Sequence, residues 1–340
     1  MGTEGPRGWS RRAFVGGMTL MGTAGLLGLR PEEAAAELPP ETRRLRLVQI
    51  PGICVAPQYV AEALLKGEGF AEVQYIREVE AFGTAKPLAS GDADISIAFA
   101  APLVIRMEAG DPIVILAGGH VGCFELFGTE RVRVIRDLKG KTVAVPGLGS
   151  IQHVFVAIIA AHVGLNPRSE IQFVTHPPGE AMRLLADGKI DAFLGFLPNP
   201  LELRAKRIGH VLLNSALDRP WSQYFCCVAA GNREFVRKHP VATKRALRAI
   251  LKAADICALE PERAARFLVD KGYEKNYNYA LQTMKEIPYG KWREYDPEDT
   301  LRFYALRLHE AGMIKSTPQK IIAQGTDWRF LNELKKELKG

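Results

Sequence analysis

One stretch of this sequence occurs twice. Residues 88–99 read LASGDADISIAF and residues 185–196 read LADGKIDAFLGF, so Leu-Ala, Gly and Asp recur at the same spacing before an apolar run that ends in Phe. The pattern predicts a helix that ends at a glycine (Gly91, Gly188), a turn at the Asp, and a strand buried on both faces. Two copies predict an α/β chain of two similar halves, whose strand ends would face one another across a ligand cleft. Ordinary helix-turn-strand sequence with both Phe side chains in the core is the alternative.

The first 36 residues have the features of an export signal. Arg11 and Arg12 precede an apolar run over residues 16–29, and three consecutive alanines follow. Paired arginines in such a segment indicate the twin-arginine route. A membrane anchor is the alternative, but the run is shorter than the ~20 apolar residues that span a bilayer. We therefore predict a signal over 1–36, a linker over 37–44 and a periplasmic protein without stable membrane insertion.

The composition is that of a globular protein. Of the 340 residues, 47% are hydrophobic and 24% are charged, which suits two domains with cores of their own. The net charge of +7 favours small anions as ligands. It is not gathered in Lys/Arg runs with interleaved aromatics, so nucleic-acid binding is not expected.

The five cysteines show no spacing that indicates a metal site, and neither a metal nor a cofactor is predicted. Two of them are adjacent and would point to opposite faces of a strand. We expect all five to be buried as small hydrophobic residues, and a disulfide remains open. They are Cys54, Cys123, Cys226, Cys227 and Cys257.

Two strand-loop-helix openings are suited to an anionic or carbonyl group, because a helix start presents free backbone N–H groups. The first leads from a strand over 45–50 through Cys54 to a helix that contains Gln58. The second is the loop Pro146-Gly147-Leu148-Gly149-Ser150, with Ser150 as the expected N-cap of a helix over 151–163. It lacks the Lys and the spacing of a nucleotide P-loop. His153, in its first turn, is either a ligand contact or a partly exposed helix residue.

The remaining elements complete two lobes joined by a hinge. Crossings near residues 120–123 and 221–225 would connect the lobes, with lobe 1 over 45–122 and 225–340 and lobe 2 over 123–224. Further strands are expected over 72–77, 113–117, 171–174 and 224–230. Beyond these, helices are expected over 233–259, 261–270, 276–286, 297–310 and 328–338, as a flank on the first lobe.

The chain resembles the periplasmic substrate-binding proteins of ABC importers, in the nitrate/sulfonate/taurine family. The resemblance extends over the whole mature chain. It rests on VQIPGICVAPQYVAEALLKGEGF, both repeated units, DLKGKTVAVPGLGS, EAGMIKS and TDWRFLNELKKELKG. It implies a two-lobed periplasmic-binding-protein fold of type II, each lobe a mostly parallel sheet flanked by helices, with a two-strand hinge. It also implies a monomer that delivers a small molecule to a permease and its ATPase.

By position, the resemblance also implies which residues face the ligand. They are Cys54, Gln58, Phe82, Gly83, Thr84, Phe99, Ala100, Ala101, His120, Gly149, Ser150, Gln152, His153, Phe196, Asn199 and Tyr224. Four of them are aromatic and none is an arginine. This favours an organic sulfonate, a carboxylate or a heteroaromatic compound over a small inorganic anion.

Two other functions remain open. The pyrimidine-synthesising relatives of this fold are enzymes with a cysteine-rich iron motif and a reactive His. Cys226, Cys227 and His153 are the nearest candidates here, but their spacing does not match, and we predict no catalytic residue. An extracytoplasmic sensor module that presents its ligand to a membrane receptor would use the same cleft.

Overall fold

The computed structural model describes residues 37–50, 52–77 and 85–339, and Pro39–Gly340 forms a unit separate from Met1–Leu38. This unit contains two five-stranded sheets. In spatial order, the first is β2 (Glu72–Arg77), β1 (Arg44–Gln49), β3 (Ile95–Phe99), β10 (Phe225–Asn232) and β4 (Ile113–Val121). The second is β7 (Gln172–Thr175), β6 (Thr142–Val145), β8 (Ala192–Phe196), β5 (Phe124–Gly128) and β9 (His210–Asn214). The predicted export signal, with Arg11 and Arg12, lies outside the described residues.

The two sheets have the same strand order and the same single reversal. β1 pairs in parallel with β2 and β3, whereas β10 is antiparallel to β3 and β4. In the second sheet, β6 pairs in parallel with β7 and β8, and β5 is antiparallel to β8 and β9. The predicted class, α/β with two mostly parallel sheets, is confirmed. We call the first sheet with its helices lobe 1 and the second lobe 2.

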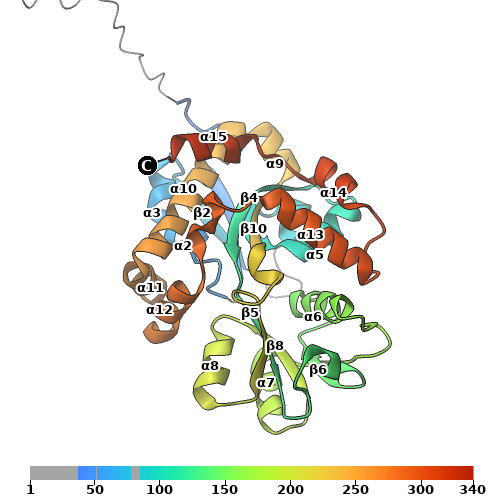
Figure 1. Ribbon diagram of the computed structural model, residues 1–340. Coiled ribbons are helices and arrows are strands. Elements are labelled where there is room, and N and C mark those ends of the chain that lie inside the picture. The colour runs from blue at the N-terminus through green and yellow to red at the C-terminus, as the bar shows by residue number, and fades with distance from the viewer. Residues whose placement is uncertain (1–36, 51, 78–84, 340) are drawn as a thin grey trace, which may run out of the picture. The chain divides into compact units, whose positions relative to one another are not determined.

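Helices flank both sheets. In lobe 1, α2, α3 and α10 lie to one side in Figure 1 and α5, α13 and α14 to the other. The lobe 1 helices are α2 (Ala56–Val60), α3 (Glu62–Gly67), α4 (Ala85–Ser90), α5 (Ala100–Glu108), α9 (Arg233–Lys238), α10 (Pro240–Leu259), α11 (Pro261–Asp270), α12 (Tyr277–Glu286), α13 (Pro297–Glu310), α14 (Pro318–Gly325) and α15 (Arg329–Glu337). The lobe 2 helices are α6 (Ile151–His162), α7 (Pro178–Ala186) and α8 (Asn199–Lys206). None of the helices in the described part of the chain is long and apolar enough to span a bilayer.

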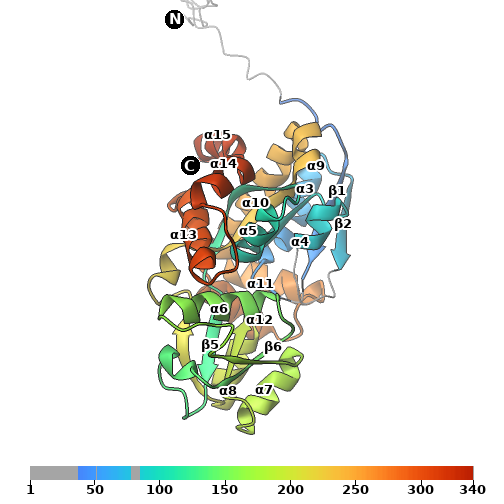
Figure 2. The ribbon, with the colours of Figure 1, turned by 90° about the vertical axis from the view of Figure 1, so that its right-hand side faces the viewer.

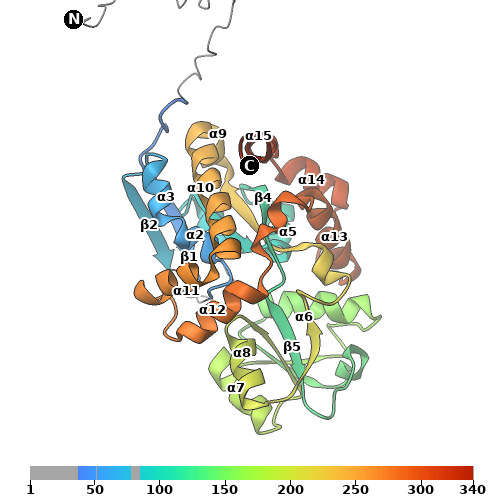
Figure 3. The same cartoon turned by 60° about the vertical axis from the view of Figure 1, so that its left-hand side comes forward.

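The chain passes between the sheets twice, at residues 122–123 and at residues 215–224. Figure 3 shows β5 leading out of lobe 1 into the middle of lobe 2. Figure 2 shows α6 on the side of lobe 2 that faces lobe 1, beneath α13, and these two helices are in contact. The start of α6 therefore lies between the lobes.

The repeated stretch forms the same unit in each lobe. Gly91 and Gly188 have φ of +79° and +66°, as expected of glycines that end helices α4 and α7. The Asp of each copy accepts a backbone hydrogen bond from the neighbouring strand, β1 or β6. Asp94 accepts the Arg46 N–H at 2.7 Å, and Asp191 accepts the Thr142 N–H at 2.9 Å. The duplicated Asp is therefore a structural residue that joins the turn before β3 or β8 to the start of β1 or β6.

One helix prediction was wrong. The single helix expected over 233–259 is two helices, α9 and α10, with a break at His239, whose φ and ψ are −130° and 60°. Pro240 begins α10, and a proline disfavours helical backbone in the residue before it. Within the predicted linker, the Glu41 carboxylate accepts the N–H groups of Val241 and Ala242 at the start of α10.

Candidate functional site between the lobes

The start of α6 has the predicted cap. The Ser150 hydroxyl is buried and accepts the His153 N–H at 3.2 Å. Gly149 has a φ of +85°, and its N–H donates to His153 Nδ1 at 3.0 Å. Burial lowers the pKa of His153, whose ring also packs on Phe173. His153 thus helps to form the loop before the helix, with Nδ1 as an acceptor.

A cavity of about 590 Å³ lies between the lobes beside this helix start. Its walls come from α4 and α5 in lobe 1, from the start of α6 in lobe 2, and from two loops. They are largely apolar and carry three cationic side chains. The lining residues are Ala85, Lys86, Pro102, Ile105, Arg106, Gly149, Val154, Arg168 and Met313. Of the predicted ligand-facing residues that the structure describes, only Gly149 lines this cavity. The three cationic residues were not predicted from the sequence to face a ligand, because they lie far apart in the sequence and follow no motif.

The two arginines of the cavity have partners that fix them in place. Arg106 pairs with Asp111 through its Nε atom, and Arg168 donates from Nη2 to the Gly312 carbonyl at 2.6 Å. A carbonyl carries no formal charge, and no ion pair of Arg168 occurs among the described residues, so Arg168 keeps a positive charge at the wall. The cavity therefore combines apolar walls with a positive potential, which suits an organic anion.

The predicted aromatic residues meet at the lobe interface, where they pack against protein. The Phe99 ring of lobe 1 lies 5.0 Å from Phe124 and 5.3 Å from Phe155, both in lobe 2. Phe196 contacts Phe124 and approaches Gly52 so closely that a Cβ there would lie 2.6 Å from its Cε2 atom. These rings close the lobes against each other. A ligand contact for Phe99 or Phe196 remains a prediction.

The other predicted residues are distributed around this interface. Gln58 is fully buried and bonds to Val48 and Ile97, so its amide joins β1 to β3. Tyr224 stacks on Phe303 with ring centroids 4.1 Å apart. Gln152 is 4% exposed at the start of α6. Ala100 and Ala101 are buried at the start of α5, and Asn199 begins α8. Phe82, Gly83 and Thr84 lie outside the described residues.

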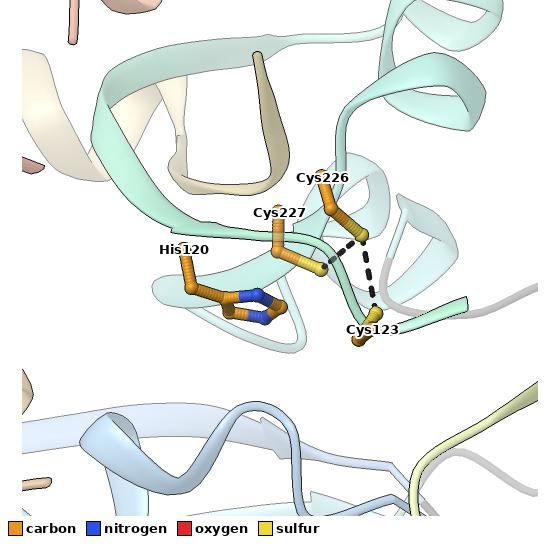
Figure 4. Close-up of side chains that lie close together, drawn as sticks. All are labelled: His120, Cys123, Cys226 and Cys227. Carbon is orange, nitrogen blue, oxygen red and sulfur yellow. Dashed lines mark hydrogen bonds between the residues drawn. The ribbon is translucent and has the colours of Figure 1, made fainter. Parts of the chain in front are cut away.

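The structure brings one group of side chains together that the sequence did not. His120, Cys123, Cys226 and Cys227 are all buried, and their donor atoms lie within 4.8 Å of one another. Figure 4 shows these side chains pointing toward a common centre. Sγ of Cys226 is 3.1 Å from Sγ of Cys123 and 3.7 Å from Sγ of Cys227. We call these four residues the Cys/His cluster.

The expectation that Cys226 and Cys227 point to opposite faces of a strand was wrong. The pairing of β10 with β4 shifts register between Phe225 and Cys227 and again between Cys227 and Val228. Such a bulge interrupts the alternation of side chains along a strand. Both thiols consequently turn into the same buried space. All five cysteines are buried, as expected, and none of them forms a disulfide. Cys257 lies apart from the others, in α10.

Burial and neighbouring charge act in opposite directions within the Cys/His cluster. Burial lowers the pKa of His120, but the Cys227 and Cys54 thiols raise it by a larger amount. The net pKa of His120 is about 10. Burial raises the pKa of Cys227, while hydrogen bonds from neighbouring thiols and the charge of His120 hold it well below its ordinary value. The contact between His120 and Cys227 therefore raises the pKa of the imidazole and lowers that of the thiol.

An ion pair near the Cys/His cluster joins lobe 2 to lobe 1. Arg204 of α8 contacts Glu286 of α12 at 2.7 Å and Glu125 of β5 at 3.5 Å. Burial raises the pKa of Glu125 to about 7, although Arg204 opposes the shift. These three residues line a second cavity, of about 340 Å³, which reaches Gly122 and Cys123.

Comparison with known proteins agrees with the two-sheet fold. The chain shares its fold with the periplasmic nitrate-binding protein NrtA from Synechocystis PCC 6803, at 15% identity and a TM-score of 0.74 over 89% of this chain and 90% of that one. It is also similar to the alkanesulfonate-binding protein SsuA from Xanthomonas axonopodis pv. citri, at 15% identity and 0.67 over 81% and 96%. The ligand-binding component of an ABC-type import system from Staphylococcus aureus matches at 12% identity and 0.69 over 86% and 99%. The fold is that of the periplasmic binding proteins.

The family assignment follows from the sequence. The model of the NMT1-like family matches residues 38–268, more than half of the chain. The chain belongs to the NMT1-like family. No curated protein sequence matches it.

Proposed function

We propose that this protein is an extracytoplasmic solute-binding protein that holds a small organic anion between its lobes and delivers it to an ABC permease and its ATPase. Family membership and the shared fold support the proposal, and the cavity between the lobes is the main observation behind it. We further propose that the chain reaches the periplasm by the twin-arginine route and acts there as a monomer.

The cavity favours an anion with a carbon skeleton. Its volume of about 590 Å³ lies within the ~300–1,000 Å³ usual for small-molecule sites. A small inorganic anion would leave most of the apolar wall uncovered. An alkanesulfonate or a carboxylate of similar size would cover that wall and place its charged group beside the cationic side chains.

Ligand capture would be coupled to closure of the lobes. The cavity is lined by α5 from lobe 1 and by Gly149 and Val154 from lobe 2, so only a closed form offers both walls to a ligand. A ligand that contacts both lobes shifts the equilibrium toward that form. The Arg204–Glu286 pair between α8 and α12 acts in the same direction.

A thermal-shift screen tests this function. The protein, expressed from its full sequence, is heated with alkanesulfonates, carboxylates, heteroaromatic compounds, nitrate and matched alkylamines. An organic anion at ~100 times its Kd should stabilise the folded state by ~2.7 kcal/mol, while the amines produce no shift. A shift given only by the amines, or by no compound, would contradict the proposal.

A pair of variants locates the ligand. Arg168→Gln removes a positive charge from the cavity wall and should weaken anion binding by about 10- to 100-fold, because hydrogen bonds to charged groups contribute ~1.5–3 kcal/mol. Arg263→Gln is the matched control, since Arg263 lies on α11 and is 65% exposed in an ion pair with Glu260, the residue before that helix. Equal affinities for the two variants would place the ligand elsewhere.

A further inference from the structure

We propose that the Cys/His cluster is a binding site for one thiophilic metal ion, with Zn²⁺ held by Cys123, Cys226, Cys227 and His120. This site is separate from the interlobe cavity, and the proposal does not depend on the identity of the solute.

The spacing of the donor atoms fits a single ion. Tetrahedral zinc has Zn–S distances of about 2.3 Å, which place its sulfur ligands about 3.8 Å apart. Sγ of Cys226 and Sγ of Cys227 are 3.7 Å apart. The Cys123–Cys226 separation of 3.1 Å needs a small widening, and all four donor atoms already lie within 4.8 Å of one another.

His120 has the hydrogen bonding of a metal ligand. Its Nδ1 lies 3.2 Å from the Gly122 carbonyl, which can only accept, so Nδ1 carries a hydrogen. Its Nε2 is buried and has no hydrogen-bond partner in the described part of the chain. A histidine that binds a metal through one ring nitrogen usually donates from the other to a carbonyl or carboxylate. An unpartnered buried nitrogen is costly in a site without an ion, and coordination would satisfy it.

Charge and ligand type favour zinc. Three thiolates and a neutral imidazole around Zn²⁺ leave a net charge of 2 − 3 = −1, whereas Cu⁺ in the same set would leave −2 in a buried site. Each of the four donors is sulfur or nitrogen, which disfavours Mg²⁺ and Ca²⁺. Zinc binding would release the thiol and imidazole protons.

The backbone is arranged to build this site. The bulge in β10 turns Cys226 and Cys227 to the same side, where regular pairing would separate them. Cys123 lies on the first crossing between the lobes, and its N–H donates to Ser215 at the start of the second. Bound zinc would therefore join β4, β10 and the first crossing at the hinge. The cavity of about 340 Å³ reaches Cys123 and gives an ion a route from Glu125 and Glu286.

Metal titration tests the site. The protein expressed from its full sequence is reduced, stripped with a chelator and titrated with ZnCl₂ or CoCl₂. We expect one Zn²⁺ per chain by elemental analysis, a raised Tm, and the visible and sulfur-to-cobalt charge-transfer bands of tetrahedral cobalt. Less than stoichiometric zinc in the reduced protein, or an octahedral cobalt spectrum, would overturn the proposal.

Matched variants assign the ligands. Cys123→Ala and Cys227→Ala should each weaken zinc binding by at least about 100-fold, whereas Cys257→Ala should retain it, because Cys257 is equally buried but lies apart in α10. His120→Gln should keep the cobalt–sulfur bands with a shifted visible spectrum. Wild-type metal binding by Cys227→Ala with native circular dichroism would refute the assignment.

Two outcomes for the purified protein would also count against it. A Cys123–Cys226 disulfide in protein isolated without reductant, seen as a loss of two hydrogens by mass spectrometry, would make the cluster a redox pair. Copper retained in preference to zinc, measured with both ions present, would overturn the choice of zinc.

Discussion

The duplicated Asp gives a stability prediction with an internal comparison. Asp94→Asn and Asp191→Asn each keep an oxygen that accepts the backbone N–H of the adjoining strand, at Arg46 or Thr142, and remove the carboxylate charge. The two sites differ in the exposure of the paired arginine. The Arg46 side chain is 26% exposed beside Asp94, and Arg131 is 50% exposed beside Asp191.

This difference sets the expected free energies. Arg131 can return to water, so Asp191→Asn should lower the free energy of unfolding by about 1–2 kcal/mol, from a weakened backbone hydrogen bond and a partly exposed ion pair. Arg46 would keep a largely buried charge without its partner. Asp94→Asn should therefore cost more, about 3 kcal/mol, as expected when one partner of a buried pair is removed. Asp187→Asn, at a side chain that is 45% exposed, is the control and should cost under about 0.5 kcal/mol.

Acid should reduce the effect of Asp191→Asn. Burial raises the pKa of Asp191, but the Thr142 N–H and the Arg131 guanidinium lower it more, so the net shift is downward. A lowered pKa contributes stability above the unfolded-state value of about 3.9, and this stability is lost as the pH falls through the folded-state value. Urea unfolding followed by circular dichroism should thus show the full loss at pH 7 and a shrinking difference from wild type below about pH 4. A larger loss for Asp191→Asn than for Asp94→Asn would refute the reasoning.

Three further changes test the lobe interface. Ser150→Ala should destabilise the protein by about 1 kcal/mol in urea unfolding, through loss of the α6 cap, and Ser150→Asp should restore the cap but repel an anion. Gly52→Ala places a Cβ 2.6 Å from Phe196 Cε2, so small-angle scattering should show a larger radius of gyration, and an unchanged radius would show that the ring can move aside. A double-mutant cycle of Arg204→Gln and Glu286→Gln should give a coupling energy of about 1 kcal/mol, and no coupling would contradict a stabilising pair between the lobes.

The parts of the fold that sequence could predict depend on neighbours along the chain. The helix-Gly-Asp-strand unit, the Ser150 cap and the strand at residues 72–77 each follow from a short pattern with a local physical cause. Repetition of the unit then predicts two similar sheets, because the same local structure must be buried twice. The short strands β5 and β9 were not predicted, since their pairing is with each other and with distant β8.

The candidate sites depend on contacts that no local pattern encodes. Cys123 and Cys226 meet only because the chain leaves lobe 1 and returns beside the same strand. The register shifts of β10 against β4 on either side of Cys227 reverse the direction expected for one of two adjacent thiols. The cations around the interlobe cavity come from separate elements, such as Arg106 on α5 and Arg168 after α6. The repeated Asp was recognised from the sequence, but its hydrogen bonds to the next strand required the three-dimensional arrangement.

The most direct test of the central claim is a crystal structure grown with the organic anion that gives the largest thermal shift. We predict electron density for that anion in the cavity between α5 and the start of α6, with its charged group beside Arg106 and Arg168. An anion bound outside that cavity, with the cavity itself empty, would contradict the account of how this protein captures its ligand.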